Sequence, residues 1–285
     1  MFNFILYKIA AFIVQALPQN KAYRLGELLA DLHLFFSAKD RRALINNLKI
    51  ILPGGADVNN KAREVSRNFA RYLADFLRFP LINQNYIREN IKLENLHFID
   101  ESLTKGKGVI LVSAHIGSWE LGGIALGLLG YDVAGVVLTH KHKLVDNFFR
   151  RQREIKGLKA IRLAEAPRKC LEYLRGNKIV ILMVDRDFTQ NGLILDFLGK
   201  KAMLPRGAAV FSLKTGAPII PTFITRNVDN TFTLHFDRPI EPGAIGDKQS
   251  DVESLMKKYL PFIEANIKKF PEQWLMFREF YINNK

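Results

Sequence analysis

Short, almost wholly apolar runs that alternate with helical patterns constrain the fold of this chain more than any other feature. The runs lie at 108–114, 133–138 and 178–184, and the helical patterns between them lie at 119–129 and 143–156. A strand reads as a continuous apolar run when helices cover both faces of its sheet. The alternation therefore predicts an α/β fold with a mixed, mostly parallel central sheet covered by helices.

Two further apolar runs, at 218–225 and 231–237, complete the predicted sheet. A helix at 250–269 follows them and ends before Pro271. The sequence shows no internal repeat, no low-complexity segment and no clear linker. We therefore predict a single domain at 37–285.

The first third of the chain is predicted to be helical. Amphipathic patterns place helices at 22–36, 40–52 and 57–79. Pro53 follows the second of these helices and Pro80 follows the third, as expected for residues that stop a helix.

The N-terminal run at 4–17 is apolar except for a polar stripe that includes Lys8. As a helix it spans about 21 Å, which is shorter than the roughly 30 Å hydrocarbon core of a bilayer. The pattern favours a helix that lies in the membrane interface, so we expect 1–36 to be a membrane-associating helical segment. A buried core helix is the alternative. A signal peptide is disfavoured because no small-residue cleavage site follows the run.

The chain is strongly basic, and this narrows the class of its partners. Its 42 Lys and Arg residues against 28 Asp and Glu residues give a net charge of +14. Such a balance favours nucleic acid, an acidic membrane surface, or an acidic substrate or carrier protein. The charges are dispersed and no nucleic-acid-binding signature appears, which disfavours nucleic acid. A lone cysteine, Cys170, excludes an intrachain disulfide and a cysteine-based zinc site.

The most informative motif follows the run at 108–114. His115 comes directly after the predicted strand, and Glu120 falls in the first turn of the next helix, with Gly117 or Ser118 as its cap. A carboxylate beside an imidazole fixes its tautomer and stabilises the imidazolium, which suits a general base that deprotonates a hydroxyl. The alternative is a structural histidine that a nearby carboxylate satisfies in a turn.

Other chemistries fit the sequence less well. Ser113 is not surrounded by the G-x-S-x-G pattern of a nucleophile elbow, and no H-E-x-x-H motif supplies a metal site. We therefore expect no metal. His140 and His142 follow a predicted strand and either line the site or belong to a polar loop.

A charged cluster follows the run at 178–184. Arg186 lies between two carboxylates, and the cluster reads either as the wall of a site or as structural pairing at a sheet edge. Basic side chains near a cleft bind phosphates or carboxylates, although most such residues only face solvent. The expected substrate-binding residues are Arg150, Arg186, Asp187 and Arg206.

Six short segments, taken together and in order, resemble a known family. They are DRRALINNL at 40–48, SAHIGSWE at 113–120, DRD at 185–187, LPRG at 204–207, TGAPIIP at 215–221 and PEQWL at 271–275. In these segments the chain resembles the lauroyl and myristoyl acyltransferases of lipid A biosynthesis, which are lysophospholipid-acyltransferase-like enzymes. The sequence departs from the family's usual ending after PEQWL.

The resemblance implies an enzyme on the cytoplasmic face of the inner membrane, held peripherally or monotopically by its N-terminal helix. It implies transfer of an acyl chain from acyl carrier protein or CoA, as co-substrate, to a hydroxyl of a lipid A precursor, with no cofactor. The family's His-x4-Asp/Glu pair corresponds to His115 and Glu120. Arg150 and Asp187 are similar to positions that line the family's acceptor cleft.

The predicted mechanism makes His115 the base that deprotonates the acceptor hydroxyl and Glu120 the carboxylate that holds the imidazole. The expected partners are acyl carrier protein, a glycolipid acceptor and an anionic membrane surface, and no nucleic acid. One alternative is an acyltransferase for another glycolipid, such as a phosphatidylinositol mannoside, or for an aminolipid. The other is a basic membrane- or nucleic-acid-binding protein without enzymatic activity.

Overall fold

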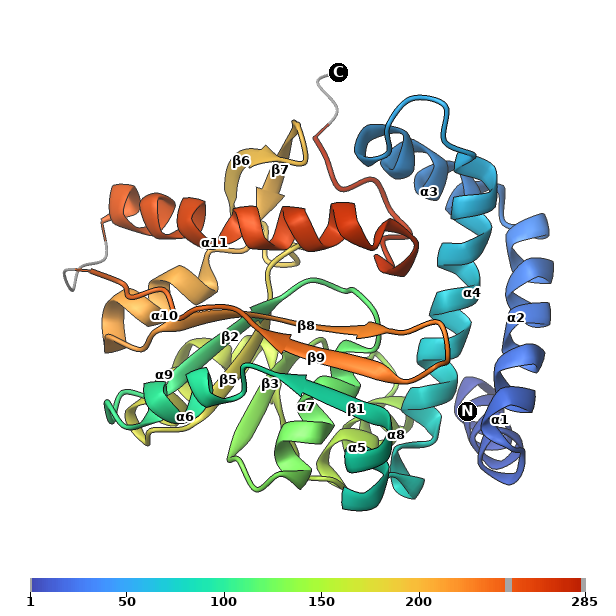
Figure 1. Ribbon diagram of the computed structural model, residues 1–285, viewed down its shortest axis with the longest axis horizontal. Coiled ribbons are helices and arrows are strands. Elements are labelled where there is room, and N and C mark those ends of the chain that lie inside the picture. The colour runs from blue at the N-terminus through green and yellow to red at the C-terminus, as the bar shows by residue number, and fades with distance from the viewer. Residues whose placement is uncertain (1, 244–247, 283–285) are drawn as a thin grey trace.

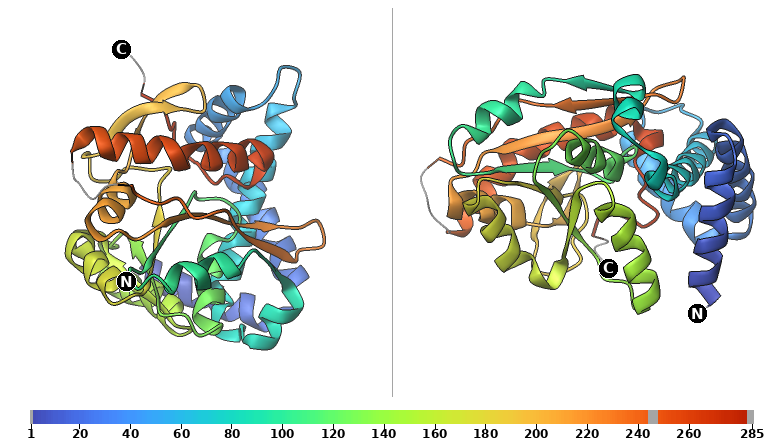
Figure 2. Two further views of the ribbon diagram at one scale, coloured as in Figure 1. Left: turned by 60° about the vertical axis from the view of Figure 1, so that its left-hand side comes forward. Right: turned by 90° about the horizontal axis from the view of Figure 1, so that it is seen from below.

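The computed structural model places a central sheet between two layers of helices, with an N-terminal group of helices at one end (Figure 1). It describes residues 2–243 and 248–282. Two further views show that the N-terminal helices stand beside the sheet rather than covering one of its faces (Figure 2).

The N-terminal group consists of α1 (Phe2–Ala16), α2 (Gln19–Phe36), α3 (Ala38–Ile51) and α4 (Val58–Leu77). Pro18 separates the first two helices, because proline disfavours helical backbone at the residue before it. Ser37 caps α3 by accepting a hydrogen bond from the backbone N–H of Asp40. Asp57 caps α4 in the same way, and both caps satisfy an N–H group that has no partner within its helix.

Ion pairs hold α2 against α4. Asp31 on α2 accepts hydrogen bonds from both Arg63 and Arg67 on α4, at 2.6–2.9 Å. Deeper in the interface, the hydroxyl of Tyr23 donates to the buried carboxylate of Asp75. Through these pairs α2 contacts the rest of the chain. The predicted boundary between a segment at 1–36 and a domain at 37–285 stays a prediction.

The central sheet is mixed but mostly parallel, as expected. Its order is β1-β9-β8-β2-β5-β3-β4, and β8 and β9 form its antiparallel pair. The strands are β1 (Ile91–Glu94), β2 (Val109–Ser113), β3 (Val133–Val137), β4 (Leu158–Arg162), β5 (Ile179–Met183), β8 (Ile219–Arg226) and β9 (Phe232–Phe236). A separate antiparallel hairpin is formed by β6 (Leu193–Phe197) and β7 (Lys200–Leu204).

Helices cover both faces of the sheet, and β2 shows why its sequence is apolar throughout. Val109 and Leu111 pack into the core on one face, while Ile110 and Val112 pack into the core on the other. The first face carries α5 (Gln84–Asn90), α6 (His97–Leu103), α7 (Trp119–Leu128) and α8 (Lys143–Glu154). The second carries α9 (Ala166–Arg175), α10 (Gly207–Thr215) and α11 (Gln249–Lys269). Short 3-10 turns are η1 (Phe79–Leu81), η2 (Leu163–Glu165) and η3 (Pro271–Gln273).

The predicted strands and helices are present within about three residues of their expected bounds. Sequence analysis missed β1, β4 and the hairpin β6–β7, whose strands mix polar and apolar residues. It also missed the short helices α5, α6, α9 and α10. Each helix within the described part of the chain is too short or too polar to cross a bilayer. Whether α1 lies in a membrane interface stays a prediction.

Candidate active site

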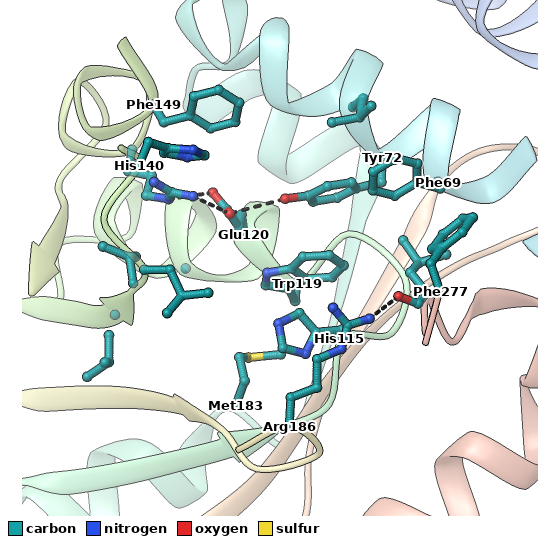
Figure 3. A pocket seen from close by; sticks show the side chains of 18 of the residues that line it. Phe69, Tyr72, His115, Trp119, Glu120, His140, Phe149, Met183, Arg186 and Phe277 are labelled. Atoms are coloured by element: carbon teal, nitrogen blue, oxygen red, sulfur yellow. Dashed lines mark hydrogen bonds and ion pairs between the residues drawn. The ribbon is translucent and has the colours of Figure 1, made fainter. Parts of the chain in front are cut away.

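Three strands of the central sheet end at one large cavity, of about 1470 Å³. This main cavity is lined by the last residues of β3 and β5, by the loop that follows β2, and by residues of α1, α2 and α4. The carboxyl ends of parallel strands share one edge of a sheet, so side chains from distant parts of the sequence converge there. Its polar and aromatic lining includes Tyr72, His115, Trp119, Glu120, His140, Arg153 and Arg186 (Figure 3).

His115 forms a pair with Asp185, which follows β5. The imidazole Nδ1 lies 2.7 Å from Asp185 Oδ1, and the backbone N–H of His115 donates to Oδ2 at 3.0 Å. An ionised carboxylate only accepts hydrogen bonds, so in the neutral form of the ring Nδ1 carries the proton and Nε2 keeps a lone pair. Among the described residues, Nε2 has no hydrogen-bond partner, and the side chain reaches the main cavity. The pair therefore has the geometry of a base held by an orienting carboxylate.

The surroundings of Asp185 keep its carboxyl ionised although its side chain is fully buried. Burial alone raises the pKa of a carboxyl, but the charge and hydrogen bond of His115, the charge of Arg186 and the indole N–H of Trp274 act in the opposite direction. Together they hold the pKa of Asp185 well below its usual range. An anionic Asp185 stabilises an imidazolium on His115 when that ring takes up a proton.

Glu120 does not hold His115, and this corrects the predicted pairing. Its two carboxylate oxygens accept hydrogen bonds from Arg153 at 2.7 and 2.8 Å, and Oε1 also accepts from the hydroxyl of Tyr72 at 3.1 Å. The turn after β2 directs His115 toward the loop after β5, whereas the first turn of α7 directs Glu120 toward α8 and α4. Figure 3 shows the two groups on opposite sides of Trp119.

Trp119 separates the two polar pairs. Its ring stacks on Tyr72 with 4.1 Å between centroids, and the His115 ring meets it at 5.0 Å in an edge-on arrangement. Such aromatic contacts restrict the rotation of the rings involved. Trp119 therefore helps to hold His115 in the orientation that Asp185 requires.

His140 also lines the main cavity, which is the first of its two expected places. His142 is not among the described residues that line the cavity, which agrees with the second expected place, a polar loop. The ring of His140 lies 4.5 Å from that of Phe149. Burial first, and then the positive charge of Arg153, lower the pKa of His140. At neutral pH this imidazole is therefore a neutral donor and acceptor beside the Glu120–Arg153 pair.

Gly117 allows the loop that carries His115 to lie against β8. Its φ angle is +60°, and a Cβ atom at this position would lie 2.0 Å from the backbone oxygen of Ile224. No residue with a side chain fits that space without moving the backbone. The glycine therefore fixes the path of the chain between His115 and α7.

The structure brings three of the four expected substrate-binding residues to the main cavity. Arg186 lies beside His115 (Figure 3), and Asp187 and Arg206 also line the cavity. Asp187 accepts hydrogen bonds from the N–H groups of Thr189 and Gly192, so it shapes its own loop.

Arg150 differs from the prediction. It lies outside the described lining of the main cavity and pairs with Glu154 at 3.5 Å on the outer side of α8. The inward-facing arginine of that helix is Arg153, which is buried and pairs with Glu120. Arg150 thus lies at the surface of α8, and Arg153 is the arginine of this helix that lines the main cavity. Binding of substrate by Arg150 stays a prediction.

Sequence analysis missed the roles of Asp185, Arg153, Tyr72 and Trp274. Asp185 was recognised only as part of a charged cluster, since the order of strands in the sheet is needed to place it beside His115. The signal that points to it is its position directly after a buried strand, like that of His115. Tyr72 and Trp274 carry no comparable signal, because a buried aromatic residue usually serves only packing.

One side of the main cavity is apolar and reaches the surface. The cavity lining includes Leu6, Ile9 and Ile13 of α1 and Leu25 and Leu29 of α2. The same helices expose further large apolar side chains, and a contiguous apolar patch marks an interaction site for a protein or a membrane. These exposed residues include Phe12, Leu28, Leu32, Phe35 and Phe36.

Comparison with known proteins identifies relatives of this chain. The profile of a family described as bacterial lipid A biosynthesis acyltransferase matches residues 1–281. A phosphatidylinositol mannoside acyltransferase of Mycobacterium tuberculosis is 29% identical over 161 residues, which are 54% of this chain and 51% of that protein. The matched part thus spans about half the length of this relative.

Two more relatives match over longer stretches of this chain. A phosphatidylinositol mannoside acyltransferase of Mycolicibacterium smegmatis is 24% identical over 242 residues, covering 83% of this chain and 78% of that protein. A lipid A biosynthesis acyltransferase of Haemophilus influenzae is 24% identical over 195 residues, covering 68% and 59% respectively.

Proposed function

Because the chain belongs to the family of bacterial lipid A biosynthesis acyltransferases, we propose that it transfers a fatty acyl chain from an acyl thioester to a hydroxyl group of a membrane lipid. The observation that carries the proposal is the His115–Asp185 pair at the edge of a large cavity with an apolar side. A base that is held in one tautomer beside an apolar cavity suits the deprotonation of a lipid hydroxyl.

In the proposed reaction His115 Nε2 removes the proton of the acceptor hydroxyl while its oxygen attacks the thioester carbonyl. A carbon–oxygen bond forms, the carbon–sulfur bond then breaks, and the imidazolium returns its proton to the leaving sulfur. Asp185 stays ionised throughout and stabilises the imidazolium through the contact at Nδ1. The two protein groups needed are already in hydrogen-bond contact, so only the substrates have to be placed.

The oxyanion that forms on the thioester carbonyl needs a nearby positive group or donor. We assign the role of stabilising this oxyanion to Arg186, which lies beside His115. Its guanidinium donates hydrogen bonds to Leu275 O and Met276 Sδ. The backbone N–H of Gly117, which lies in the loop after His115, donates to Gln273 O and is therefore occupied. A fixed guanidinium in a half-buried cavity stabilises developing negative charge more strongly than water does.

We propose a different role for the Glu120–Arg153 pair. It is buried, with side-chain exposures of 9% and 11%, and lies across Trp119 from His115. Together with Tyr72 and the neutral His140 it forms a polar wall suited to the hydroxyl-bearing head of the acceptor. We therefore propose that this pair orients the acceptor rather than the catalytic imidazole.

The acceptor is proposed to be a glycolipid. The description of the family supports a lipid A precursor, and the H. influenzae relative is named for lipid A biosynthesis. A phosphatidylinositol mannoside is the second candidate, because the two mycobacterial relatives are named for that acceptor. The donor is proposed to be an acyl carrier protein or CoA thioester, and the net charge of +14 favours an acidic carrier.

Membrane association is proposed to occur through α1 and α2. Their exposed apolar side chains adjoin the apolar side of the main cavity, so a lipid can enter without crossing a polar surface. A basic protein is further attracted to an anionic leaflet. We place the enzyme at the cytoplasmic face of the inner membrane, where acyl thioesters are available.

The test uses the full chain purified in detergent and incubated with acyl carrier proteins that bear different acyl chains. One set of reactions receives a lipid A precursor and the other a phosphatidylinositol mannoside, and mass spectrometry identifies the acylated lipid. We expect product with one acceptor class and none for a folded His115→Ala variant. Product formation by that variant, or no product with any glycolipid, would contradict the proposal.

A further inference from the structure

The carboxylate of Asp185 has a third contact that the proposed reaction does not yet use. The indole N–H of Trp274 donates to Asp185 Oδ2 at 2.9 Å. Oδ2 also accepts the backbone N–H of His115, whereas Oδ1 faces the imidazole. The contact at Oδ2 thus determines how the carboxylate is turned, and with it the direction in which Oδ1 points.

Trp274 belongs to a short extended segment that runs beside the loop carrying His115. Trp274 and Ile116 form an antiparallel bridge. On either side of that bridge, Gly117 N–H donates to Gln273 O at 3.0 Å and Leu275 N–H donates to His115 O at 2.8 Å. The segment therefore holds the backbone of the histidine loop as well as the carboxylate.

The segment is itself fixed to three other parts of the molecule. Gln273 forms two hydrogen bonds with the backbone of Arg226 on β8, at 2.8 and 2.9 Å. Asn47 on α3 donates to Met276 O and Arg278 O at 3.0 and 2.8 Å. Asn68 on α4 donates to Glu272 O at 2.8 Å. Such anchoring leaves Trp274 little freedom to move away from Asp185.

We propose that Trp274 is a positioning residue that acts on His115 through Asp185. Its indole N–H fixes Oδ2, so that Oδ1 meets the Nδ1 proton of the imidazole along a constant direction. The inference rests on the proposed function for its effect on turnover, but the contact itself concerns the His115–Asp185 pair alone. Trp274 does not reach the substrate; its side chain is buried and lies behind the carboxylate.

The decisive variant is Trp274→Phe, which removes the N–H and keeps most of the ring packing. Phe280→Leu is the matched control, because it disturbs packing against Trp274, whose ring lies 5.4 Å away, but leaves the indole N–H in place. For Trp274→Phe we expect kcat to fall about 10- to 100-fold, as for the loss of a hydrogen bond to a charged group. KM for both substrates is expected to stay within about twofold, because the substrate-facing groups are unchanged.

The second readout is the pKa of His115, followed by NMR titration of 15N-histidine-labelled protein and assigned with the His115→Asn variant. A carboxylate that loses one donor attracts the imidazolium proton more strongly, so the pKa of His115 is expected to rise in Trp274→Phe. Other charged or titratable groups near the pair are Arg186 beside Asp185, and Tyr72, Glu120 and Arg153 beyond Trp119. All of them are retained in both variants.

The two readouts separate the possible failures. An unchanged His115 pKa together with wild-type kcat in Trp274→Phe would overturn the positioning role. A lower kcat with an unchanged pKa, matched by Phe280→Leu, would reduce Trp274 to a packing residue and also overturn it. A shifted pKa in a protein that acylates no lipid at all would leave the positioning role intact and would contradict the proposed function instead.

Discussion

The imidazole of His115 contacts the carboxylate of Asp185, 70 residues further along the chain, and not that of Glu120 in the adjoining helix. Parallel pairing of β2 with β5 brings the ends of these two strands together. Glu120, although near in sequence, is engaged by Arg153 and Tyr72. The proposed general base and the carboxylate that holds it thus come from neighbouring strands rather than from one motif.

The first prediction separates the two carboxylates. Asp185→Asn removes the anion that stabilises the imidazolium and favours the wrong tautomer of His115, so kcat is expected to fall about 10³- to 10⁴-fold. Glu120→Gln keeps the contact of His115 with Asp185, and we expect it to raise KM for the acceptor more than it lowers kcat. Steady-state kinetics with both variants provide the check. A larger loss of kcat in Glu120→Gln than in Asp185→Asn would restore the pairing expected from the sequence.

The second prediction concerns the buried Glu120–Arg153 pair. Arg153→Met leaves the carboxylate of Glu120 buried without its main partner, which is expected to cost about 3–5 kcal/mol of unfolding free energy. The double variant Glu120→Gln/Arg153→Met removes both charges, so it is expected to be more stable than Arg153→Met alone. Urea denaturation of the detergent-solubilised variants measures both values. Equal stability of the single and double variants would show that the two charges do not depend on each other.

The sequence predicts the layered fold well, because burial on both faces leaves a clear apolar pattern in β2, β3 and β5. It does not predict the order of the strands, and this order decides which residues meet at the cavity. His115 could be identified from its place after a buried strand. Its pairing with Asp185 could not, since nothing in the local sequence shows that β5 lies beside β2.

The same limit explains why Glu120 and Arg150 lie elsewhere than expected. Glu120 was paired with His115 because it is close in sequence, but the first turn of α7 carries it to the far side of Trp119. Arg150 and Arg153 lie on the same amphipathic helix, and the basic pattern alone does not show which of them faces inward. The packing of α8 against the sheet decides this, and it buries Arg153.

The third prediction concerns the acyl chain and depends on Gly135 of β3. Gly135 lines the main cavity, and a Cβ atom there would meet only Leu158 Cδ1 at an ordinary distance of 3.7 Å. A larger side chain can therefore enter the cavity without displacing the backbone. We expect Gly135→Leu to prefer shorter acyl donors, with a loss of about fourfold in kcat/KM for each methylene group that no longer fits.

A donor series of increasing chain length, assayed with the wild-type protein and the variant, measures this preference. Leu158→Ala supplies the control in the opposite direction, because it removes a side chain from the same part of the lining and is expected to favour longer donors. An equal loss of kcat/KM for all donors in Gly135→Leu would place the acyl chain elsewhere in the cavity.

The fourth prediction concerns membrane binding through α1 and α2. Phe12, Phe35 and Phe36 each expose more than 70% of their surface. The triple substitution to Ser is expected to weaken binding to anionic phospholipid vesicles at least about tenfold, because it removes apolar surface that would insert between the lipids. Val228→Ser, at a fully exposed position between β8 and β9, is the control and is expected to bind as the wild type does. Vesicle sedimentation measures both, and unchanged binding of the triple variant would exclude this face.

The fifth prediction concerns stability in acid. The pKa of Asp185 is held well below its usual range in the folded protein, while in the unfolded chain it returns to about 3.9. The unfolded chain therefore binds more protons between these two values. The stabilisation contributed by Asp185 is fully present above about pH 5 and is lost as the pH falls through about 4 toward the folded-state pKa. Asp185→Asn is expected to flatten this part of the curve of unfolding free energy against pH.

Urea denaturation between about pH 3 and 7 records that curve for the wild type and the variant. Asp196→Asn is the matched control, because Asp196 is 80% exposed and its ion pair with Lys201 lies at the surface, where such pairs contribute little. We expect this control to keep the acid dependence of the wild type. The same acid dependence in Asp185→Asn would show that the contacts of Asp185 with His115 and Trp274 do not stabilise the folded protein.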